Sequence, residues 1–307
     1  MKTGFLCLLL ISIFFSCKKS STEDSDSLRL TEVRNIQDGA RAYTTLFTYD
    51  DQARVVKVEL VRAGEAATVL ATISYRGNEM IMLTPEVQQP DATIKQKVIY
   101  TLNEQYLPVR RLTLDTLFFG PPNVQRDYNT DTIDYTYDAA GLLVRKTGRG
   151  RDSSWSSGGA YIQIETRQLT GMYTNTNGNL TSYEQVFVKN LKSVINGTVM
   201  STNKTTYEEA ITYDYTKKLP NRIDPRNAVV FSEFANSLQE HYQWNSLYRK
   251  SPNGYTAGWK EKDANNTITD SRTFTNQPDV WLNKSGYIEK IVYGPTGKNF
   301  TEFIYTK

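Results

Sequence analysis

The sequence predicts an all-β protein: a large antiparallel meander, strongly curved or barrel-like, with one helix inserted late in the chain. Three observations predict this fold. Apolar and polar residues alternate with a period of two from Leu30 onward. The alternating stretches are rich in Thr, Tyr, Val and Ile, which suit a pleated surface. Turn-forming Asp, Asn and Gly separate consecutive stretches, as in a series of hairpins.

The predicted strands follow one another along most of the chain. In residues 54–60, for example, the alternation places Val56, Val58 and Leu60 on one face of a strand. Comparable stretches bring the total to about fifteen strands, at 42–49, 54–60, 67–75, 79–84, 96–102, 107–114, 131–137, 142–147, 160–167, 180–188, 205–213, 255–261, 267–274, 287–293 and 299–306.

The turns carry a repeated signature, of which Tyr137-Asp138-Ala139-Ala140-Gly141-Leu142 is the clearest copy. The Asp side chain can accept hydrogen bonds from the backbone ahead of it, and a Gly three residues later can adopt a positive φ. Arg76-Gly77-Asn78 is predicted as a tighter two-residue turn. Further copies start at Asn175, Asn283 and Gly294, and copies with Ala53 or Tyr106 in place of the Gly start at Asp50 and Asn103.

One stretch breaks the strand pattern and predicts a single helix within 225–248. Asp224 can cap its start, and Pro225 suits a first helical position. Residues 252–254, Pro-Asn-Gly, end it. The apolar residues at helical spacing are Phe231, Phe234, Ala235, Leu238 and Tyr242.

Fifteen strands joined mostly to their sequence neighbours make a sheet that must curl, split or close, because strand twist accumulates and exposed edges promote aggregation. A curved sheet with the helix packed at or inside its mouth is therefore expected. No linker interrupts residues 30–307, which are predicted to form a single β domain.

The N-terminus has the features of a targeting segment. Lys2 precedes an apolar run, Phe5–Phe15, whose 11 residues fall within the roughly 7–15 of a signal-peptide core and are too few for a membrane-spanning helix. Ser16-Cys17 directly after this run resembles the lipobox of bacterial lipoproteins. The resemblance implies a signal peptide at 1–16, cleavage before Cys17 and acylation of the Cys17 thiol. Residues 17–29 are then a flexible tether.

The predicted location is the bacterial outer membrane, through the N-terminal acyl anchor. The Phe-rich signal and the short Ser-rich, acidic tether resemble those of Bacteroidetes lipoproteins. In those proteins, residues just after the Cys can direct surface display. Lys19, Glu23 and Asp24 match such a signal incompletely, so the periplasmic and the cell-surface face both stay open.

The turn motif also resembles that of known families. The stretch Thr132-Ile-Asp-Tyr-Thr-Tyr-Asp-Ala-Ala-Gly-Leu-Leu-Val144 is similar to the YD repeats of large secreted Rhs-type proteins. Together with the lipobox, the late helix and the Tyr-containing C-terminal strand, the chain resembles the DUF4595-type lipoproteins of Bacteroidetes over most of 30–307. The resemblance implies a porin-like β fold and an envelope location, and it implies no activity.

Composition excludes several kinds of chemistry. The chain has 36 basic and 33 acidic residues, one His and two Cys. A net charge of +3 does not indicate a nucleic-acid partner, and one His with two Cys cannot build a His/Cys zinc site. No nucleotide-binding or serine-hydrolase motif occurs, and His241 on the predicted helix has no marked catalytic partner. No catalytic residue, metal or cofactor is therefore predicted.

Aromatic residues are the remaining candidates for ligand binding, because exposed rings can stack on sugars or hold apolar ligands. The alternative interpretation is that they fill the core between helix and sheet. Trp155 lies in a Ser/Gly-rich segment at 152–159 that is predicted to be a loop. The candidate residues are Trp155, Tyr242, Trp244, Tyr248 and Trp259.

The leading functional hypothesis is a lipid-anchored, non-enzymatic envelope protein that binds a glycan, a lipid or a protein partner. One alternative is a carboxylate-dependent glycan hydrolase, which needs two acids in a cleft, roughly 5–10 Å apart. The other is a structural or assembly partner of an outer-membrane complex, which predicts a large exposed apolar patch.

Overall fold

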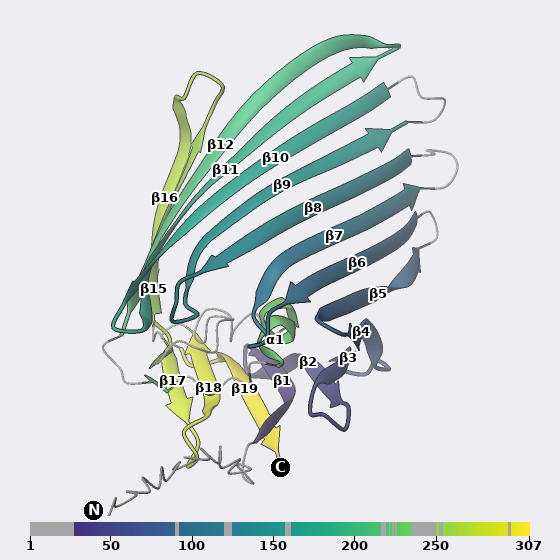
Figure 1. The fold of residues 1–307 in the computed structure, drawn as a ribbon. Coiled ribbons are helices and arrows are strands. Elements are labelled where there is room, and N and C mark those ends of the chain that lie inside the picture. The colour runs from purple at the N-terminus through teal and green to yellow at the C-terminus, as the bar shows by residue number, and fades with distance from the viewer. Residues whose placement is uncertain are drawn as a thin grey trace, which may run out of the picture.

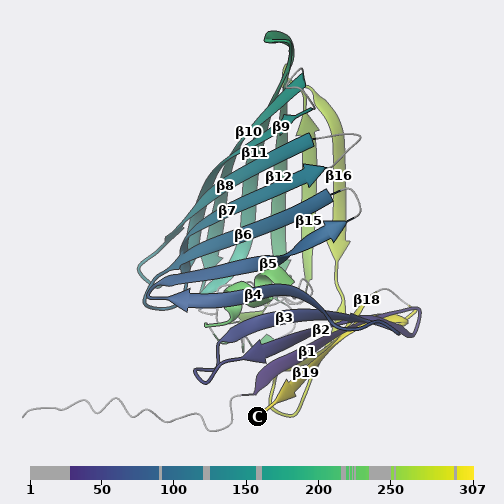
Figure 2. The same cartoon turned by 90° about the vertical axis from the view of Figure 1, so that its right-hand side faces the viewer.

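The predicted fold class is confirmed. The structure, a computed structural model, describes residues 28–307 apart from 90–91, 120–124, 157–160, 216–218, 221, 223, 225, 235–249, 252–253 and 294–295. Its described residues form a 17-stranded antiparallel sheet, a separate two-stranded pair and the helix α1 (Ala228–Phe234). The sheet curves strongly around α1 without closing (Figures 1 and 2).

The strands are longer than the sequence pattern indicates, and they reach 17 residues in β11 and β12. The strands of the large sheet are β1 (Arg29–Gln37), β2 (Ala40–Tyr49), β3 (Val55–Arg62), β4 (Thr68–Arg76), β5 (Glu79–Gln89), β6 (Ala92–Leu102), β7 (Pro108–Phe119), β8 (Gln125–Tyr137), β9 (Leu143–Trp155), β10 (Tyr161–Thr176), β11 (Asn179–Ile195), β12 (Thr198–Asp214), β15 (Gly254–Lys262), β16 (Ile268–Asn276), β17 (Asp279–Leu282), β18 (Ile288–Tyr293) and β19 (Asn299–Thr306). The short pair is β13 (Leu219–Pro220) with β14 (Lys250–Ser251).

Strand pairing follows the chain with two exceptions. Consecutive strands pair from β1 to β12, from β15 to β16 and from β17 to β19. The exceptions are β12 with β15 and the N-terminal β1 with the C-terminal β19. No register joins β16 to β17 in the described residues, so these two strands are the ends of an open sheet.

The molecule has two regions of different construction. The first, here called the base, comprises β17–β19, β1–β4 and α1, and it contains most of the apolar core. The second, here called the wall, comprises the long strands β7–β12 with β15 and β16 (Figure 1). The Phe47 and Phe231 rings pack edge to face at 5.2 Å, which joins α1 to the base. Core residues without exposed surface include Val55, Val58, Val230, Ile288 and Ile291.

One turn geometry recurs five times. At Asp138, the side-chain Oδ1 accepts hydrogen bonds of 2.9 Å from the Ala140 and Leu142 amides. The fourth residue of each copy is left-handed, including Ala53 at φ 59° and Tyr106 at φ 61°, where Gly is missing. The first residues of the five copies are Asp50, Asn103, Asp138, Asp263 and Asn283.

The predictions for two other turns had different outcomes. The two-residue turn at Gly77-Asn78 is confirmed, since Arg76 pairs with Glu79. The copy predicted to start at Asn175 is wrong, because Thr176 pairs with Asn179 and the turn consists of Asn177 and Gly178, both at positive φ. Two left-handed residues in succession match the right-handed twist of the flanking strands.

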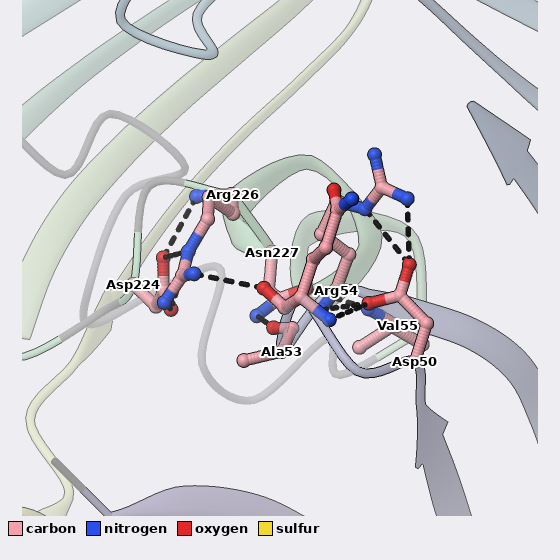
Figure 3. Close-up of polar contacts among 8 residues, drawn as sticks. Asp50, Ala53, Arg54, Val55, Asp224, Arg226 and Asn227 are labelled. Atoms are coloured by element: carbon pink, nitrogen blue, oxygen red, sulfur yellow. Dashed lines mark hydrogen bonds and ion pairs between the residues drawn. The ribbon is translucent and has the colours of Figure 1, made fainter. Parts of the chain in front are cut away.

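The helix begins three residues later than the predicted Pro225, and Asp224 is not its cap. The Asp224 side chain instead binds Arg226, with 2.6 Å between Arg226 Nη2 and Asp224 Oδ2. Asn227 precedes α1 and is buried (Figure 3). Its Oδ1 accepts a 2.8 Å hydrogen bond from the Val55 amide, and its Nδ2 donates a 2.9 Å bond to the Ala53 carbonyl. The predicted helical residues after Phe234 lie outside the described part.

Candidate functional site

The inner face of the wall, defined here as the face that α1 contacts, carries the candidate site. Glu233 on α1 lies 3.6 Å from Arg111 Nη2 on β7, which identifies this face, and it accepts a hydrogen bond from the Tyr100 hydroxyl, whose residue is paired with Arg111 on the neighbouring β6. Directly paired residues of an antiparallel sheet project on the same side. The registers therefore place twelve inner-face residues of β7–β10 in three rows: Arg111, Ile133, Gly148 and Leu169; Thr113, Asp131, Gly150 and Arg167; and Asp115, Asn129, Asp152 and Glu165.

Ion pairs and hydrogen bonds connect the charged members of these rows. Arg167 Nη2 lies 3.4 Å from Asp131 Oδ1 and donates a hydrogen bond to Asn129. Glu165 Oε2 lies 2.5 Å from Lys189 Nζ on the next strand. Because these side chains are half-buried, their geometry is held by the sheet and by one another.

Glycines make the space for this cluster. A Cβ built on Gly150 would lie 1.6 Å from Asp131 Oδ1, and one on Gly148 would lie 3.2 Å from Leu169 Cβ. The space above the two glycines is a cavity of about 270 Å³. Its inner-face lining includes Arg111, Thr113, Asp115, Asp131, Arg167 and Phe187.

Four buried polar atoms around the cavity make no hydrogen bond within the described structure. They are two donors, Arg111 Nε and Arg167 Nε, and two acceptors, Asp115 Oδ1 and Asp152 Oδ1. A buried polar atom without a partner costs about 1–3 kcal/mol. Four such atoms in adjacent rows therefore indicate a place where a polar molecule is accommodated.

Burial also alters the acid–base properties of this face. It raises the pKa of Asp131 and of Asp152, although the nearby Arg167 opposes both shifts. It lowers the pKa of Lys146 to about 8, against the attraction of Glu209. The Lys146 ammonium lies 4.7 Å from the centre of the Tyr183 ring.

A strip of aromatic rings continues from the cavity across the inner face. Phe187 on β11 is paired with Leu169 of the first row. The rings of Phe187 and Tyr207 are 5.9 Å apart, and those of Tyr207 and Trp259 are 5.8 Å apart. All three rings are half-buried. We call Phe187, Tyr207 and Trp259 the aromatic strip.

A second cavity, of about 300 Å³, lies between the wall and α1. Arg111 and Lys146 line it from the sheet, and Ser232 and Glu233 line it from the helix. Arg111 and Ile133 line both cavities, and Arg111 Nη2 lies 3.6 Å from Glu233 Oε1.

The structure describes two of the five predicted aromatic candidates and places them on opposite faces of the sheet. Trp259 belongs to the aromatic strip. Trp155 is on the outer face, where its ring packs edge to face against Tyr128 at 5.5 Å. The loop predicted at 152–159 is wrong in its first half, since residues 152–155 end β9. Cys17, His241, Tyr242, Trp244 and Tyr248 lie outside the described residues.

Sequence reasoning missed the charged rows altogether. Their one visible signal is Gly148 and Gly150, which are two residues apart in a strand and so share a face. Asp131, Arg167 and Asp115 come from three different strands, and only the registers bring them together.

Comparisons with known proteins find solved structures that resemble this chain, but no family model or curated protein that matches its sequence. A porin-like protein from Bacteroides vulgatus matches with TM-score 0.46 and 13% identity, over 90% of this chain and 98% of that one. A porin-like protein from Bacteroides uniformis matches with TM-score 0.40 and 10% identity, over 90% and 96%.

The described residues lack two further features. They contain no group of three or more His, Cys, Asp or Glu side chains placed to hold a metal ion. No helix in the same residues is long and apolar enough to cross a membrane.

Proposed function

We propose that this protein is a lipid-anchored, non-enzymatic component of the bacterial outer membrane that binds a glycan on the inner face of its wall. The observation that carries the proposal is the aromatic strip next to a charged cavity. Sugar rings stack on aromatic rings, and their hydroxyls both donate and accept hydrogen bonds. The inner face offers both kinds of contact, because Leu169 and Phe187 link the cavity to the strip.

The test uses the two described tryptophans as a matched pair. Purified protein is screened against envelope and host polysaccharides, and the best ligand is titrated by calorimetry. Trp259→Ala and Tyr207→Ala should each weaken binding by about tenfold or more, as expected for a central aromatic contact. Trp155→Ala, on the outer face, should bind like the unmodified protein. A protein that binds no polysaccharide, or equal losses in the two Trp variants, would refute the proposal.

The anchor rests on the lipobox-like Ser16-Cys17 and on the polar tether that follows. Two or three acyl chains on Cys17 would hold the protein at a membrane. Mass spectrometry of the mature protein should find acyl chains on Cys17. A Cys17→Ser variant should leave the membrane fraction. An unmodified Cys17 thiol would rule the anchor out.

The family resemblance to DUF4595-type lipoproteins belongs to the same proposal. The open, strongly curved antiparallel sheet and the recurring turns that start at Asp or Asn support it.

A carboxylate-dependent hydrolase is the second candidate, favoured by one observation. Asp115 and Asp131 face the same cavity, and burial raises the Asp131 pKa, which suits a general acid. Asp131→Asn should then abolish release of reducing ends from a bound polysaccharide and leave binding intact. Binding without any release by the unmodified protein would exclude this candidate.

A further inference from the structure

The cavity above Gly148 and Gly150 has the features of a site for one sugar residue, as distinct from the extended surface of the aromatic strip. Its volume, about 270 Å³, is below the range of roughly 300–1,000 Å³ typical of drug-sized ligands. A single ring therefore suits it better than an oligosaccharide. The strip leads away from it, so a chain that enters the cavity by its end would continue across Phe187.

The chemistry of the lining selects among polar ligands. Three of the buried atoms that lack a hydrogen bond belong to lining residues: Arg111 Nε, Arg167 Nε and Asp115 Oδ1. Arg167 Nε also lies 3.7 Å from Glu165 Oε1, which is an ion pair too long to be a hydrogen bond. A ligand that satisfies all three must accept two hydrogen bonds and donate one. Asp115 Oδ2 already accepts a hydrogen bond of 3.2 Å from Asn129 Nδ2, so Oδ1 is the oxygen that lacks a donor. Neighbouring hydroxyls of a sugar both donate and accept, whereas a carboxylate only accepts and would leave Asp115 Oδ1 without a donor.

The balance of charges around the cavity also favours a neutral ligand. On the inner face, the guanidinium groups of Arg111 and Arg167 are offset by the carboxylates of Asp115 and Asp131. Arg167 Nη2 lies 3.4 Å from Asp131, and Arg111 Nη2 lies 3.6 Å from Glu233. Because each cation already has a carboxylate partner, an anionic ligand would meet no excess of positive charge.

We propose that this cavity binds a single neutral sugar residue, the terminal residue of a glycan, through Arg111 Nε, Arg167 Nε and Asp115 Oδ1. The inference rests on the proposed function and goes further by naming the ligand class and its contacts. Asp115→Asn is the sharpest change, because it keeps the size of the side chain and leaves a single oxygen. Asn129 Nδ2 needs that oxygen as its acceptor, so an NH2 group replaces Oδ1 at the cavity and removes the acceptor there. Gly150→Ala fills the cavity from its floor, where the added Cβ meets Asp131. Gly258→Ala is the matched control, since a Cβ there meets nothing within 4 Å.

Ligand-observed NMR would test binding of glucose, galactose, mannose and N-acetylglucosamine, with glucuronate and galacturonate as acidic counterparts. At least one neutral sugar should bind the unmodified protein and the Gly258→Ala variant. Asp115→Asn should weaken that binding by about tenfold, as expected for a lost hydrogen bond to a charged group. Gly150→Ala should abolish it. Acidic sugars should bind more weakly than their neutral counterparts.

Three results would overturn the inference: no monosaccharide binds, acidic sugars bind more tightly, or Asp115→Asn binds normally. The first would mean that the cavity holds water only. Failure here is separable from failure of the proposed function. Polysaccharide binding that Trp259→Ala removes and Asp115→Asn leaves unchanged would refute the cavity site and keep the strip. If a circular dichroism spectrum showed Gly150→Ala to be misfolded, Asp115→Asn would decide alone.

Discussion

The base and the wall are parts of one sheet, yet they are stabilised in different ways. In the base, strands and α1 enclose an apolar core in which Ile288, Ile291 and Phe303 are almost wholly buried. In the wall, β10–β12 expose both faces to some degree, and their longest stretches contain few fully buried residues. The wall therefore depends on strand pairing and on side-chain networks such as that of Arg167. The difference indicates a stable support that holds a polar surface in position.

The largest expected effect on stability comes from comparing the same substitution, isoleucine to alanine, in the base and in the wall. Ile291→Ala in β18 removes a side chain with no exposed surface, and Ile195→Ala in β11 removes one that is 40% exposed. Urea denaturation should show a loss of about 2–5 kcal/mol for Ile291→Ala. The loss for Ile195→Ala should stay below about 1 kcal/mol. Equal losses would mean that the base has no special role in stability.

A glycine pair sharpens the comparison within the wall. A Cβ on Gly171 would lie 2.9 Å from the Tyr183 ring and 3.0 Å from Lys146, whereas one on Gly258 meets open space. Gly171→Ala should cost about 1–3 kcal/mol through overpacking. Gly258→Ala should be neutral or slightly stabilising, because alanine restricts the unfolded chain. Thermal melts of the two variants would decide, and a neutral Gly171→Ala would show that this face is loosely packed.

Lys146 makes the stability of the wall depend on pH. Its pKa is about 8 in the folded chain, below the ordinary value of 10.5, mainly because of burial. Between these values the unfolded chain binds the proton and the folded one has released it, so stability rises with pH from about 8 to about 10. The gain relative to Lys146→Met should be on the order of 1 kcal/mol. If the unfolding free energies of the unmodified protein and of Lys146→Met changed equally with pH, burial of Lys146 would not be the cause.

The smallest expected effect concerns a turn of the base. Ala53 has φ 59°, a conformation in which a Cβ is strained. Ala53→Gly should therefore raise the unfolding free energy by about 0.5–1 kcal/mol. Ala140→Gly, outside the positive-φ position of the equivalent turn, should lower it by a similar amount. Chemical denaturation of both variants measures the two unfolding free energies. If both changed in the same direction, Ala53 would not be the strained position of its turn.

The turns could be predicted because their information is local. Asp138 and Gly141 specify a geometry within a few residues, and the same geometry forms at Tyr106, where the sequence lacks Gly. Tyr106 shows that strand pairing can impose a left-handed residue. The turn at Asp263 was missed, since Asn266 takes the Gly position there.

The side of the sheet on which a residue projects could not be predicted wherever a strand contains a bulge. Val55 and Val58 are fully buried, whereas Val56, predicted to share a face with Val58, is half-buried. Leu60 does share a face with Val58, as predicted, because no bulge in β3 lies between them. Thr48 pairs with Lys57 and Tyr49 with Val55, so Val56 is an extra residue that reverses the alternation. The edge strand β17 was missed because its four residues are too few to show a period.

The candidate site was the least predictable part. Trp259 could be predicted as a ligand-binding candidate because it is aromatic. Its neighbours Tyr207 and Phe187, however, come from strands some 50 and 70 residues earlier. Strand register decides which polar residues meet across four strands, and register is a property of the assembled sheet. Composition and spacing along one strand therefore carry little of that information.

The pairing of β1 with β19 has a consequence for biosynthesis. Val33, near the start of the described residues, lies opposite Phe303, four residues before the last described residue. A ribosome must therefore add the residues from Val33 to Phe303 before β1 can meet its partner. The hairpins of the wall are complete long before then, because each needs only the next strand along. The region that the folded protein relies on for its strength is thus the one whose first strand must wait for β19.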